Sequence, residues 1–571
     1  MVLKTRDTVV GMKGTGSERD PKYIFVVGGV MSSVGKGVAA GSIGAILQGK
    51  GLTVTAMKID PYVNVDAGTM NPTEHGEVFV LNDGMECDQD MGNYERFLGI
   101  DLTRTNYMTT GSIYLRVIQK ERNLEYKGRC VHVVPDIPLA VIEQIKRCGS
   151  ENDADVVIIE VGGTVGDYQN VLFLEAVRLM KFEDAGDVLL VLVSYIPALG
   201  VGGNELKTKP TQHAVRFLNS SGLQPDMVLA RSGGPVDAKR KEKLEYMCGL
   251  EKGSIISAPD VESIYEIPLN YEKDHFSDFI FKKLGIDSKK ENGLTEWKKL
   301  SDAVKHATET VKIGIVGKYF DTGNFVLTDA YISVIEAIKH SAYAHDRKPM
   351  LTWINSKDFE TGEKQVAILK DLDGIIVPGG FGESGIEGKI QAIEYARVNT
   401  IPYLGLCYGM QLMIVEYARH IAGLKDANTT EINPKTAYPV IDIMPEQKRH
   451  IAEGKYGATM RLGAYPAKLT KETIAAESYG ETEISERHRH RYEVNPEYIA
   501  QLEKVGLVFS GKSPDGVLME IAELPKSVHP FFLGTQFHPE LKARPLSPHP
   551  LFNAFIKACL VGRQAAIEHK G

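Results

Sequence analysis

The chain has 571 residues, of which 43% are hydrophobic and 25% are charged, and it contains 56 glycines. At roughly 150 residues per domain, this length predicts more than one domain, and the composition is typical of a globular protein. The formal net charge of −8 excludes a basic field that would draw the whole molecule onto nucleic acid. Any phosphate binding must therefore come from local groups.

The cysteine pattern and the apolar stretches bear on the compartment. Six cysteines are scattered without a CxxC pair, which argues against a disulfide framework or zinc finger and favours a reducing, cytoplasmic setting. The N-terminus is charged too early to supply a signal-peptide core. Pro197 and several glycines interrupt the longest apolar stretch before the about 20 residues that a membrane span needs. We expect a soluble protein without a membrane or nucleic-acid partner.

The first half of the chain alternates short strands with helices. Residues 1–20 are polar and aperiodic, so we expect a mobile extension. YIFVV and LTVTAMKI have strand patterns, and a helix is expected over Val38 to Gln48 between them. DVVIIEVGG and DVLLVLVS are nearly continuous apolar runs, typical of parallel strands covered on both faces. This alternation predicts a doubly wound sheet.

A second α/β pattern follows a change in composition. EKDHFSDFIFKKLG predicts a closing amphipathic helix, and the charged run after it predicts a linker that is partly helical. VKIGIVGKY then begins a new series of strands. The expected fold class is therefore α/β with two doubly wound parallel-sheet domains, the first of them P-loop-like. The expected boundaries are an extension at 1–20, a first domain at 21–285, a linker at 286–310, a second domain at 311–562 and a tail at 563–571.

The turn GGVMSSVGKG resembles a P-loop. Backbone N–H groups and a helix N-terminus can cradle phosphate oxygens there, and Lys36 adds a positive charge. The turn departs from GxxxxGK[ST] at two positions, because Val30 replaces the first glycine and Gly37 replaces the hydroxyl residue that touches magnesium. A structural glycine turn is the alternative for this segment taken alone.

Charged residues at the ends of neighbouring strands strengthen the phosphate interpretation. Lys58 ends the second strand and Glu160 lies in the apolar run DVVIIEVGG, so both are expected at the carboxyl edge of the sheet. Asp90 lies in an acidic stretch, where most carboxylates are simply solvated. A pair of carboxylates suits Mg²⁺, which binds oxygen ligands together with substrate phosphates. Glu160 and Asp90 are therefore candidate magnesium ligands, and a solvated Asp90 is the alternative for that residue taken alone.

The second half carries a cysteine at a sharp turn. GLCYGM places Cys407 between a strand and a helix, where the sulfur is exposed and the helix dipole favours negative charge. His538 and Glu540 in QFHPE suit a general base and the group that orients it. In PGGFG, Gly379 and Gly380 can direct N–H groups at an oxyanion, together with the N–H of Tyr408. A lone cysteine or histidine is usually incidental, but the combination predicts a catalytic site.

These motifs resemble a known family in their order. GGVMSSVGKG, MKIDPYVNVDAGTMNPTEHGEVFVLNDG, EVGGTVGD and ELKTKPTQH resemble the amidoligase domain of CTP synthases, and GLCYGM with QFHPE resembles a class I glutamine amidotransferase. The resemblance spans about residues 22–560. It implies ATP contacts at Ser33, Gly35, Lys36, Gly37, Lys58 and Asp90, magnesium at Asp90 and Glu160, and UTP or CTP contacts at Ser32, Asp167, Lys207, Gln212 and Lys243. It also implies the triad Cys407, His538 and Glu540, glutamine contacts at Gly380, Glu431 and Arg491, and an ammonia gate at His75.

The resemblance also implies an activity and its regulation. ATP would phosphorylate the uracil O4 of UTP with Mg²⁺ present, and ammonia released from glutamine would travel internally to displace the phosphate and give CTP. GTP would activate allosterically, CTP would inhibit, and homotetramers could stack into filaments. After Asp167 the family usually has Ile-Glu-Ser, whereas this chain has Tyr168, Gln169 and Asn170. That departure bears on pyrimidine recognition and on inhibition by CTP.

Three alternatives remain beside this interpretation. Another ATP-dependent amidoligase fused to a glutaminase would aminate a carboxylate, but MKIDPYVNVDAGTMNP and KTKPTQH favour UTP. A bare glutaminase or γ-glutamyl hydrolase would have no use for Lys36, Lys58, Asp90 and Glu160. A catalytically dead filament scaffold should have lost an essential group, and none is lost.

Overall fold

The computed structural model describes residues 21–199, 205–290, 293–317, 328–380, 385–444, 447 and 457–568. The expected extension 1–20 lies outside these ranges. By internal contacts the described chain forms two compact units. Unit 1 comprises the described residues up to Val65 together with Asn93–Lys298, and unit 2 comprises Asp66–Gly92 together with the described residues from Lys299 onward.

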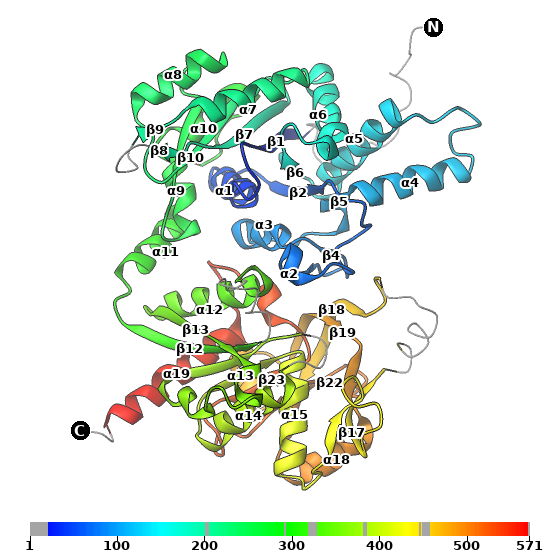
Figure 1. The fold of residues 1–571 in the computed structure, drawn as a ribbon, viewed down its shortest axis with the longest axis vertical. Coiled ribbons are helices and arrows are strands. Elements are labelled where there is room, and N and C mark those ends of the chain that lie inside the picture. The colour runs from blue at the N-terminus through cyan, green and yellow to red at the C-terminus, as the bar shows by residue number, and fades with distance from the viewer. Residues whose placement is uncertain are drawn as a thin grey trace. The chain divides into compact units, whose positions relative to one another are not determined.

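Unit 1 is built on a parallel sheet, drawn in blue to green in Figure 1. Its seven strands within the described residues run in the order β11-β10-β7-β1-β6-β2-β5. Every neighbouring pair is parallel, as the continuous apolar runs predict. The strands are β1 (Lys22–Gly29), β2 (Val54–Asp60), β5 (Tyr107–Thr109), β6 (Val156–Thr164), β7 (Val188–Tyr195), β10 (Met227–Ser232) and β11 (Ile255–Pro259).

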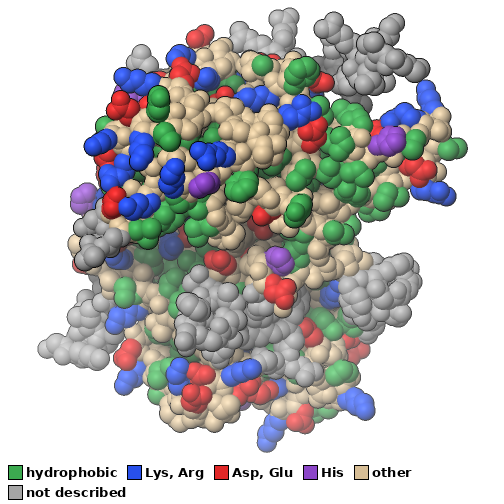
Figure 2. Space-filling model, turned by 45° about the horizontal axis from the view of Figure 1, so that its top comes forward, with side chains coloured by type: hydrophobic (Ala, Val, Ile, Leu, Met, Phe, Trp, Pro, Cys, Tyr) green, Lys and Arg blue, Asp and Glu red, His purple; other side chains and the backbone are tan. Residues whose placement is uncertain are grey.

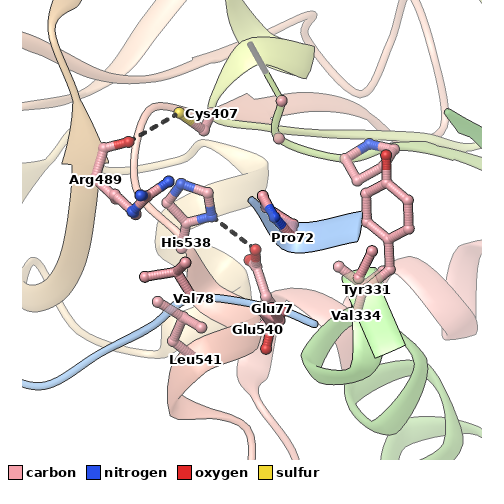
Figure 3. A pocket seen from close by; sticks show the side chains of 14 residues that line it. Pro72, Glu77, Val78, Tyr331, Val334, Cys407, Arg489, His538, Glu540 and Leu541 are labelled. Carbon is pink, nitrogen blue, oxygen red and sulfur yellow. Dashed lines mark hydrogen bonds and ion pairs between the residues drawn. The ribbon is translucent and has the colours of Figure 1, made fainter. Parts of the chain in front are cut away.

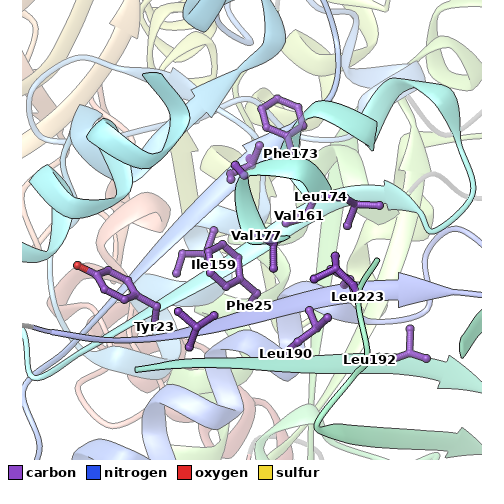
Figure 4. Close-up of a cluster of buried hydrophobic side chains, with 14 of the residues drawn as sticks. Tyr23, Phe25, Ile159, Val161, Phe173, Leu174, Val177, Leu190, Leu192 and Leu223 are labelled. Carbon is purple, nitrogen blue, oxygen red and sulfur yellow. The ribbon is translucent and has the colours of Figure 1, made fainter. Parts of the chain in front are cut away.

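Helices cover both faces of this sheet. On β1, Phe25 points into a buried cluster with helices α5, α6 and α7 (Figure 4). Ile24 is buried on the opposite face, where α1 packs. The helices are α1 (Lys36–Gly49), α4 (Thr110–Arg122), α5 (Val133–Glu151), α6 (Val171–Glu183), α7 (Lys209–Ser220), α8 (Ala238–Cys248), α9 (Ile267–Glu272) and α10 (Phe276–Leu284). Two more, α3 (Asp90–Leu98) and α11 (Thr295–His306), pass from one unit to the other along the chain.

Unit 2 contains a larger, mixed sheet. Its nine strands in the described part run in the order β13-β12-β14-β15-β23-β22-β21-β18-β19. The first five are parallel and the remaining pairs are antiparallel. They are β12 (Thr310–Gly317), β13 (Lys348–Asn355), β14 (Gly374–Val377), β15 (Tyr403–Leu406), β18 (Arg461–Leu469), β19 (Glu483–His490), β21 (Val508–Lys512), β22 (Met519–Glu523) and β23 (Phe532–Thr535).

The other elements of unit 2 complete its layers and a smaller sheet. Its helices are α12 (Ile332–Ala344), α13 (Ser356–Glu360), α14 (Ile386–Val398), α15 (Tyr408–His420), α17 (Ile474–Tyr479), α18 (Pro496–Lys504) and α19 (Pro550–Glu568). The smaller sheet consists of β16 (Ala427–Thr429), β17 (Tyr438–Ile443) and β20 (Tyr492–Val494). Residues 66–92 contribute α2 (Pro72–His75), β3 (Phe79–Val80) and β4 (Glu86–Cys87).

The expected fold class is confirmed, with differences in detail. The linker expected at 286–310 contains α11, in keeping with the predicted partial helix, whereas the tail expected from 563 continues as α19 to Glu568. Segment 66–92, expected in the first domain, packs with unit 2 instead, because buried side chains such as Phe79 and Glu86 contact β19. The antiparallel strands were not expected. In the described part of the chain, no helix has the length and apolar character needed to cross a membrane.

Candidate functional site

The turn between β15 and α15 holds Cys407 in a strained conformation. Its φ of 50° and ψ of −98° lie outside the usual regions for a residue with a side chain. The glycines on either side are required by close packing. A Cβ at Gly409 would lie 2.1 Å from the carbonyl oxygen of Val377, and one at Gly405 would lie 2.6 Å from the hydroxyl of Tyr403. The G-x-C-x-G pattern therefore reflects close packing around the strand-to-helix turn that holds Cys407.

His538 and Glu540 follow β23 and face this cysteine (Figure 3). The Nδ1 of His538 lies 2.7 Å from Oε1 of Glu540, and the backbone N–H of His538 donates to the carbonyl of Arg487 at 2.7 Å. Burial lowers the pKa of His538, but the negative charges of Glu540 and Cys407 outweigh burial and raise the pKa well above its usual value. The geometry brings the predicted triad together and favours a charged imidazole beside the sulfur.

Gly379 follows β14 and lies directly against this pair. A Cβ there would lie 2.9 Å from Cε1 of His538 and 3.8 Å from Cβ of Cys407. Gly380 lines the same pocket, and Tyr408 begins α15 immediately after the cysteine. The sequence analysis missed Gln536, whose side-chain amide lies 3.6 Å from the sulfur of Cys407. Gln536 could have been predicted from the sequence, because it is a polar residue directly after an apolar strand.

The pocket at Cys407 draws its wall from distant parts of the chain, all within unit 2. Segment 66–92 supplies Pro72, Glu77 and Val78, and the start of α12 supplies Tyr331 and Val334, as Figure 3 shows. The Glu77 carboxylate accepts bonds from the backbone and the hydroxyl of Ser333 at the start of α12. The remaining lining residues are Ala330, Pro378, Gly379, Gly380, Cys407, Arg489, His538, Glu540 and Leu541. The pocket is therefore incomplete without residues from before the second domain.

The predicted glutamine contacts fall in two groups. Gly380 lines the pocket, whereas Glu431 and Arg491 are not among its lining residues. Arg491 donates to Oε1 of Gln447 at 2.6 Å. Burial raises the pKa of Tyr492, with the charge of Glu431 adding to that rise and the charge of Arg491 opposing it.

The phosphate-like loop of unit 1 contains three residues with positive φ. These are Val30 at 77°, Ser33 at 53° and Gly35 at 89°. Lys36 is buried, and its ammonium donates to the carbonyl of Gly163 at 3.1 Å at the end of β6. Ser32 and Ser33 are exposed, while Gly37 is buried at the start of α1.

A basic residue beside this loop was not predicted. Arg231, near the end of β10, donates to the carbonyl of Val34 at 3.3 Å. A Cβ at Gly35 would lie 2.7 Å from Nη1 of Arg231. Arg231 could have been predicted from the sequence, because a cation at the carboxyl end of an apolar strand lies at the sheet edge where ligands bind.

Lys58 and Glu160 form a buried ion pair across β2 and β6. Their Nζ and Oε1 atoms lie 2.8 Å apart, and the two residues are register partners. The hydroxyl of Tyr94 donates to the other oxygen of Glu160, and Asp60 lies 3.7 Å from Lys58. Two acidic groups and one lysine therefore meet at the carboxyl edge of the sheet.

Asp90 and His75 belong to unit 2, so the pairing of Asp90 with Glu160 stays a prediction. His75 is exposed at the end of α2, and Asp90 begins α3. Within the described residues, Glu394, Glu416 and His420 cluster closely enough to share a metal ion. Arg397 already neutralises Glu416 there through contacts at 2.7 and 3.0 Å, so we assign no metal to that group.

The predicted pyrimidine contacts lie in the loop before α1, just after β9 (Glu205–Leu206), on α7, on α8 and in the turn after β6. Lys207 pairs with Glu205 at 2.6 Å, and Lys243 is exposed on α8. Gln212 is buried on α7, and its Oε1 has no hydrogen-bond partner within the described chain. The Asp167 carboxylate accepts from the backbone N–H of Thr164 at 2.9 Å. Gln212 thus offers a buried acceptor that a ligand can satisfy.

Comparison with known proteins places these two sites in one family. The CTP synthase N-terminus model matches residues 22–286, and the class I glutamine amidotransferase model matches residues 326–558. A CTP synthase from Carboxydothermus hydrogenoformans is 50% identical over 540 residues, covering 94% of this chain and 98% of the relative. The chain belongs to the CTP synthase family. A CTP synthase from Halalkalibacterium halodurans is 48% identical over 94% of this chain and 99% of its own length.

A solved structure is similar to part of this CTP synthase family member. It is the glutaminase domain of Trypanosoma brucei CTPS with bound acivicin, at 36% sequence identity. The match covers 44% of this chain and 94% of that chain, with a TM-score of 0.40.

Proposed function

We propose that this chain converts UTP to CTP, with ATP as activator and glutamine as nitrogen donor. Family membership supports the proposal, and the observation that carries it is the presence of two separate groups of candidate reactive residues. One is Cys407 with its His538–Glu540 pair, and the other is the lysine-rich edge of the parallel sheet. A glutaminase alone would have no use for the second set.

In the glutaminase site, Cys407 attacks the amide carbon of glutamine and His538 transfers the proton to the leaving ammonia. Glu540 holds the imidazole through its 2.7 Å contact and stabilises its charge. The N–H groups of Gly379, Gly380 and Tyr408 stabilise the oxyanion. Glu431 and Arg491 bind the amino acid end of glutamine, with Gly380 contacting the same substrate. Water then releases glutamate.

In the synthase site, Lys36 and Lys58 neutralise the phosphates of ATP, and backbone N–H groups of Gly35 and Gly37 cradle them beside Ser33. Asp90 and Glu160 would hold Mg²⁺, since carboxylate oxygens are the ligands this ion prefers. The buried Glu160 beside Lys58 fits that task, because its charge is already stabilised by Lys58 and Tyr94. Magnesium would supply charge neutralisation during phosphoryl transfer to the uracil O4.

The pyrimidine nucleotide is bound by Ser32, Asp167, Lys207, Gln212 and Lys243. Basic groups around Glu205 make this region attractive to phosphates, since Lys207, Arg240 and Lys243 together lower the pKa of that exposed carboxyl. The buried Oε1 of Gln212 supplies an acceptor for a base or ribose donor. Gln169, exposed where the family has an acid, bears on inhibition by CTP.

Ammonia must reach the uracil without entering bulk water, where it would be lost or protonated. We propose that it leaves the Cys407 pocket past segment 66–92, with His75 as a gate. The support is that Pro72 and Val78, on either side of His75 in sequence, line that pocket.

We further propose GTP activation, CTP inhibition and a homotetramer capable of stacking into filaments. The tetramer is supported by exposed apolar side chains on α4 and α5, including Leu115, Ile118, Val133 and Leu139. Apolar side chains gather on the side of the molecule where these helices lie (Figures 1 and 2). All six cysteines lie in the described part of the chain, and none forms a disulfide there, which fits a reducing cytoplasm.

The deciding experiment measures CTP formation from UTP, ATP and Mg²⁺ with glutamine or ammonium chloride as nitrogen source. Cys407→Ala should abolish the glutamine reaction and keep the ammonia reaction. No CTP from either source with the wild type would refute UTP as substrate and favour another amidoligase or a bare glutaminase.

A further inference from the structure

Strand β19 presents alternate side chains to two different partners within unit 2. Arg487 and Arg489 reach segment 66–92, where Arg487 donates to Oδ1 of Asn82 at 2.6 Å. His488, one residue out of phase, instead lies 3.5 Å from Glu520 on β22. Two arginines on one face of the strand therefore contact segment 66–92, and Arg487 also donates to the carbonyl of Leu541 at 3.4 Å.

Arg489 contacts both this segment and the nucleophile. Its Nε donates to Oε1 of Glu86 at 2.9 Å, and its Nη2 donates to the carbonyl of Gly68 at 3.3 Å. Its own backbone carbonyl lies 3.9 Å from the sulfur of Cys407, and its side chain lines the pocket (Figure 3). Arg489 therefore contacts both the turn that holds Cys407 and the segment that lines the pocket.

The Glu86 carboxylate, which pairs with Arg489, is enclosed by the protein. Glu86 is 2% exposed, and burial raises the pKa of its carboxyl while the charge of Arg489 opposes that rise. A Cβ at Gly68 would lie 2.1 Å from Oε2 of Glu86. Gly68 must therefore be a glycine for the carboxylate to meet Arg489 in this position.

We propose that the ion pair of Glu86 and Arg489, closed over by Gly68, is a latch that positions segment 66–92 against the Cys407 pocket and retains released ammonia. The inference rests on the proposed function. The position of the segment in the chain supports this role. It follows β2, which carries Lys58, and it precedes Tyr94, whose hydroxyl donates to Glu160. These residues position the segment and do not touch the reacting atoms.

Loss of the latch has a signature that simple misfolding does not. Glutamine would still be hydrolysed at Cys407, but ammonia would escape, so the glutamate formed per CTP would rise. Synthesis from added ammonium chloride would continue, because that route does not need a closed pocket. A purely structural role would lower both activities in parallel.

The test compares glutamate and CTP production by the wild type, Glu86→Gln and Gly68→Ala, with glutamine and with ammonium chloride. We expect close to one glutamate per CTP in the wild type and a several-fold higher ratio in both variants. The ammonia-dependent rate should stay within about twofold of wild type. Glu86→Gln removes the negative charge of the ion pair, whereas Gly68→Ala crowds the carboxylate of Glu86.

Matched controls isolate the latch from general effects of these changes. Glu416→Gln breaks another buried ion pair of unit 2, the 2.7 Å contact with Arg397. Gly457→Ala adds a methyl with ordinary contact, 3.7 Å from Thr69. Both should keep the wild-type ratio.

The outcomes are separable. A wild-type ratio in both latch variants, or a parallel loss of both activities, overturns the latch and leaves the proposed function standing. Failure of the wild type to make CTP overturns the proposed function, and the latch with it.

Discussion

At the scale of single residues, the glutaminase site depends on the absence of side chains as much as on their presence. Gly379, Gly405 and Gly409 each stand where a methyl group would meet another atom at less than 3.0 Å. Cys407 adopts a positive φ between the last two. Positions of this kind tolerate little substitution, because a shift of about 1 Å in a reacting group can reduce a rate roughly a hundredfold.

Gly379→Ala should reduce glutamine-dependent CTP synthesis by about tenfold to a hundredfold, because the new methyl would push His538 away from Cys407. The ammonia-dependent rate should remain, since that reaction does not use the triad. Gly562→Ala is the control, because an added Cβ there meets nothing within 4 Å. Equal glutamine-dependent rates for Gly379→Ala and wild type would show that the ring is free to move.

Glu540→Gln should lower glutaminase activity roughly a hundredfold, because it removes the charge that holds and stabilises the imidazolium. It should also change how stability depends on pH. The pKa of His538 is raised in the folded state, so the stabilising contribution is complete below the unfolded pKa of about 6.5 and disappears as pH rises through the raised value.

The free energy of unfolding, from urea titrations between pH 6 and pH 9.5, provides the measurement. The deficit of Glu540→Gln should be largest, about 3 kcal/mol, near pH 6 and should shrink as the pH rises. A deficit that grows with pH would contradict the assigned direction of the shift.

At the scale of elements, the phosphate-like loop stores backbone strain. Val30 has a φ of 77°, a conformation that β-branched residues rarely adopt, at the position where a P-loop has glycine. The Val30 side chain is 39% exposed, so its packing contributes little stability to offset the strain. The loop is therefore strained beside the proposed ATP site.

Val30→Gly should raise the free energy of unfolding by about 1 kcal/mol. Relief of strain is worth about 1–3 kcal/mol, and the more flexible unfolded chain costs about 0.4–1 kcal/mol. Val63→Gly is the control, because Val63 is exposed without a positive φ and the change should destabilise. Urea unfolding of both variants tests this, and a destabilised Val30→Gly would mean that the loop is not strained.

At the scale of the whole molecule, the exposed apolar side chains of α4 and α5 predict self-association. Ile118→Glu should reduce the tetramer fraction, because a charge in a buried apolar interface is left unpaired. Light scattering after gel filtration measures the mass. Val398→Glu, at an exposed site on α14, is the control. An unchanged mass for Ile118→Glu would exclude this surface from the interface.

The sequence by itself determined the fold class, the parallel strands and most candidate residues. Long apolar runs between glycine turns fix a buried parallel sheet, because such strands must be covered on both faces. GLCYGM and QFHPE predicted Cys407, His538 and Glu540 as a triad, since a strand-to-helix turn with a cysteine and a histidine followed by a carboxylate have local signatures, and the structure places all three along one pocket.

Only the tertiary structure decided where segment 66–92 belongs and what completes the pocket. Its strands have two residues each, too short for periodicity to be informative. Its place depends on Glu86 and Asn82 meeting arginines about 400 positions later in the chain. Contacts between residues so far apart depend on the assembled sheet, so no local pattern could have predicted them.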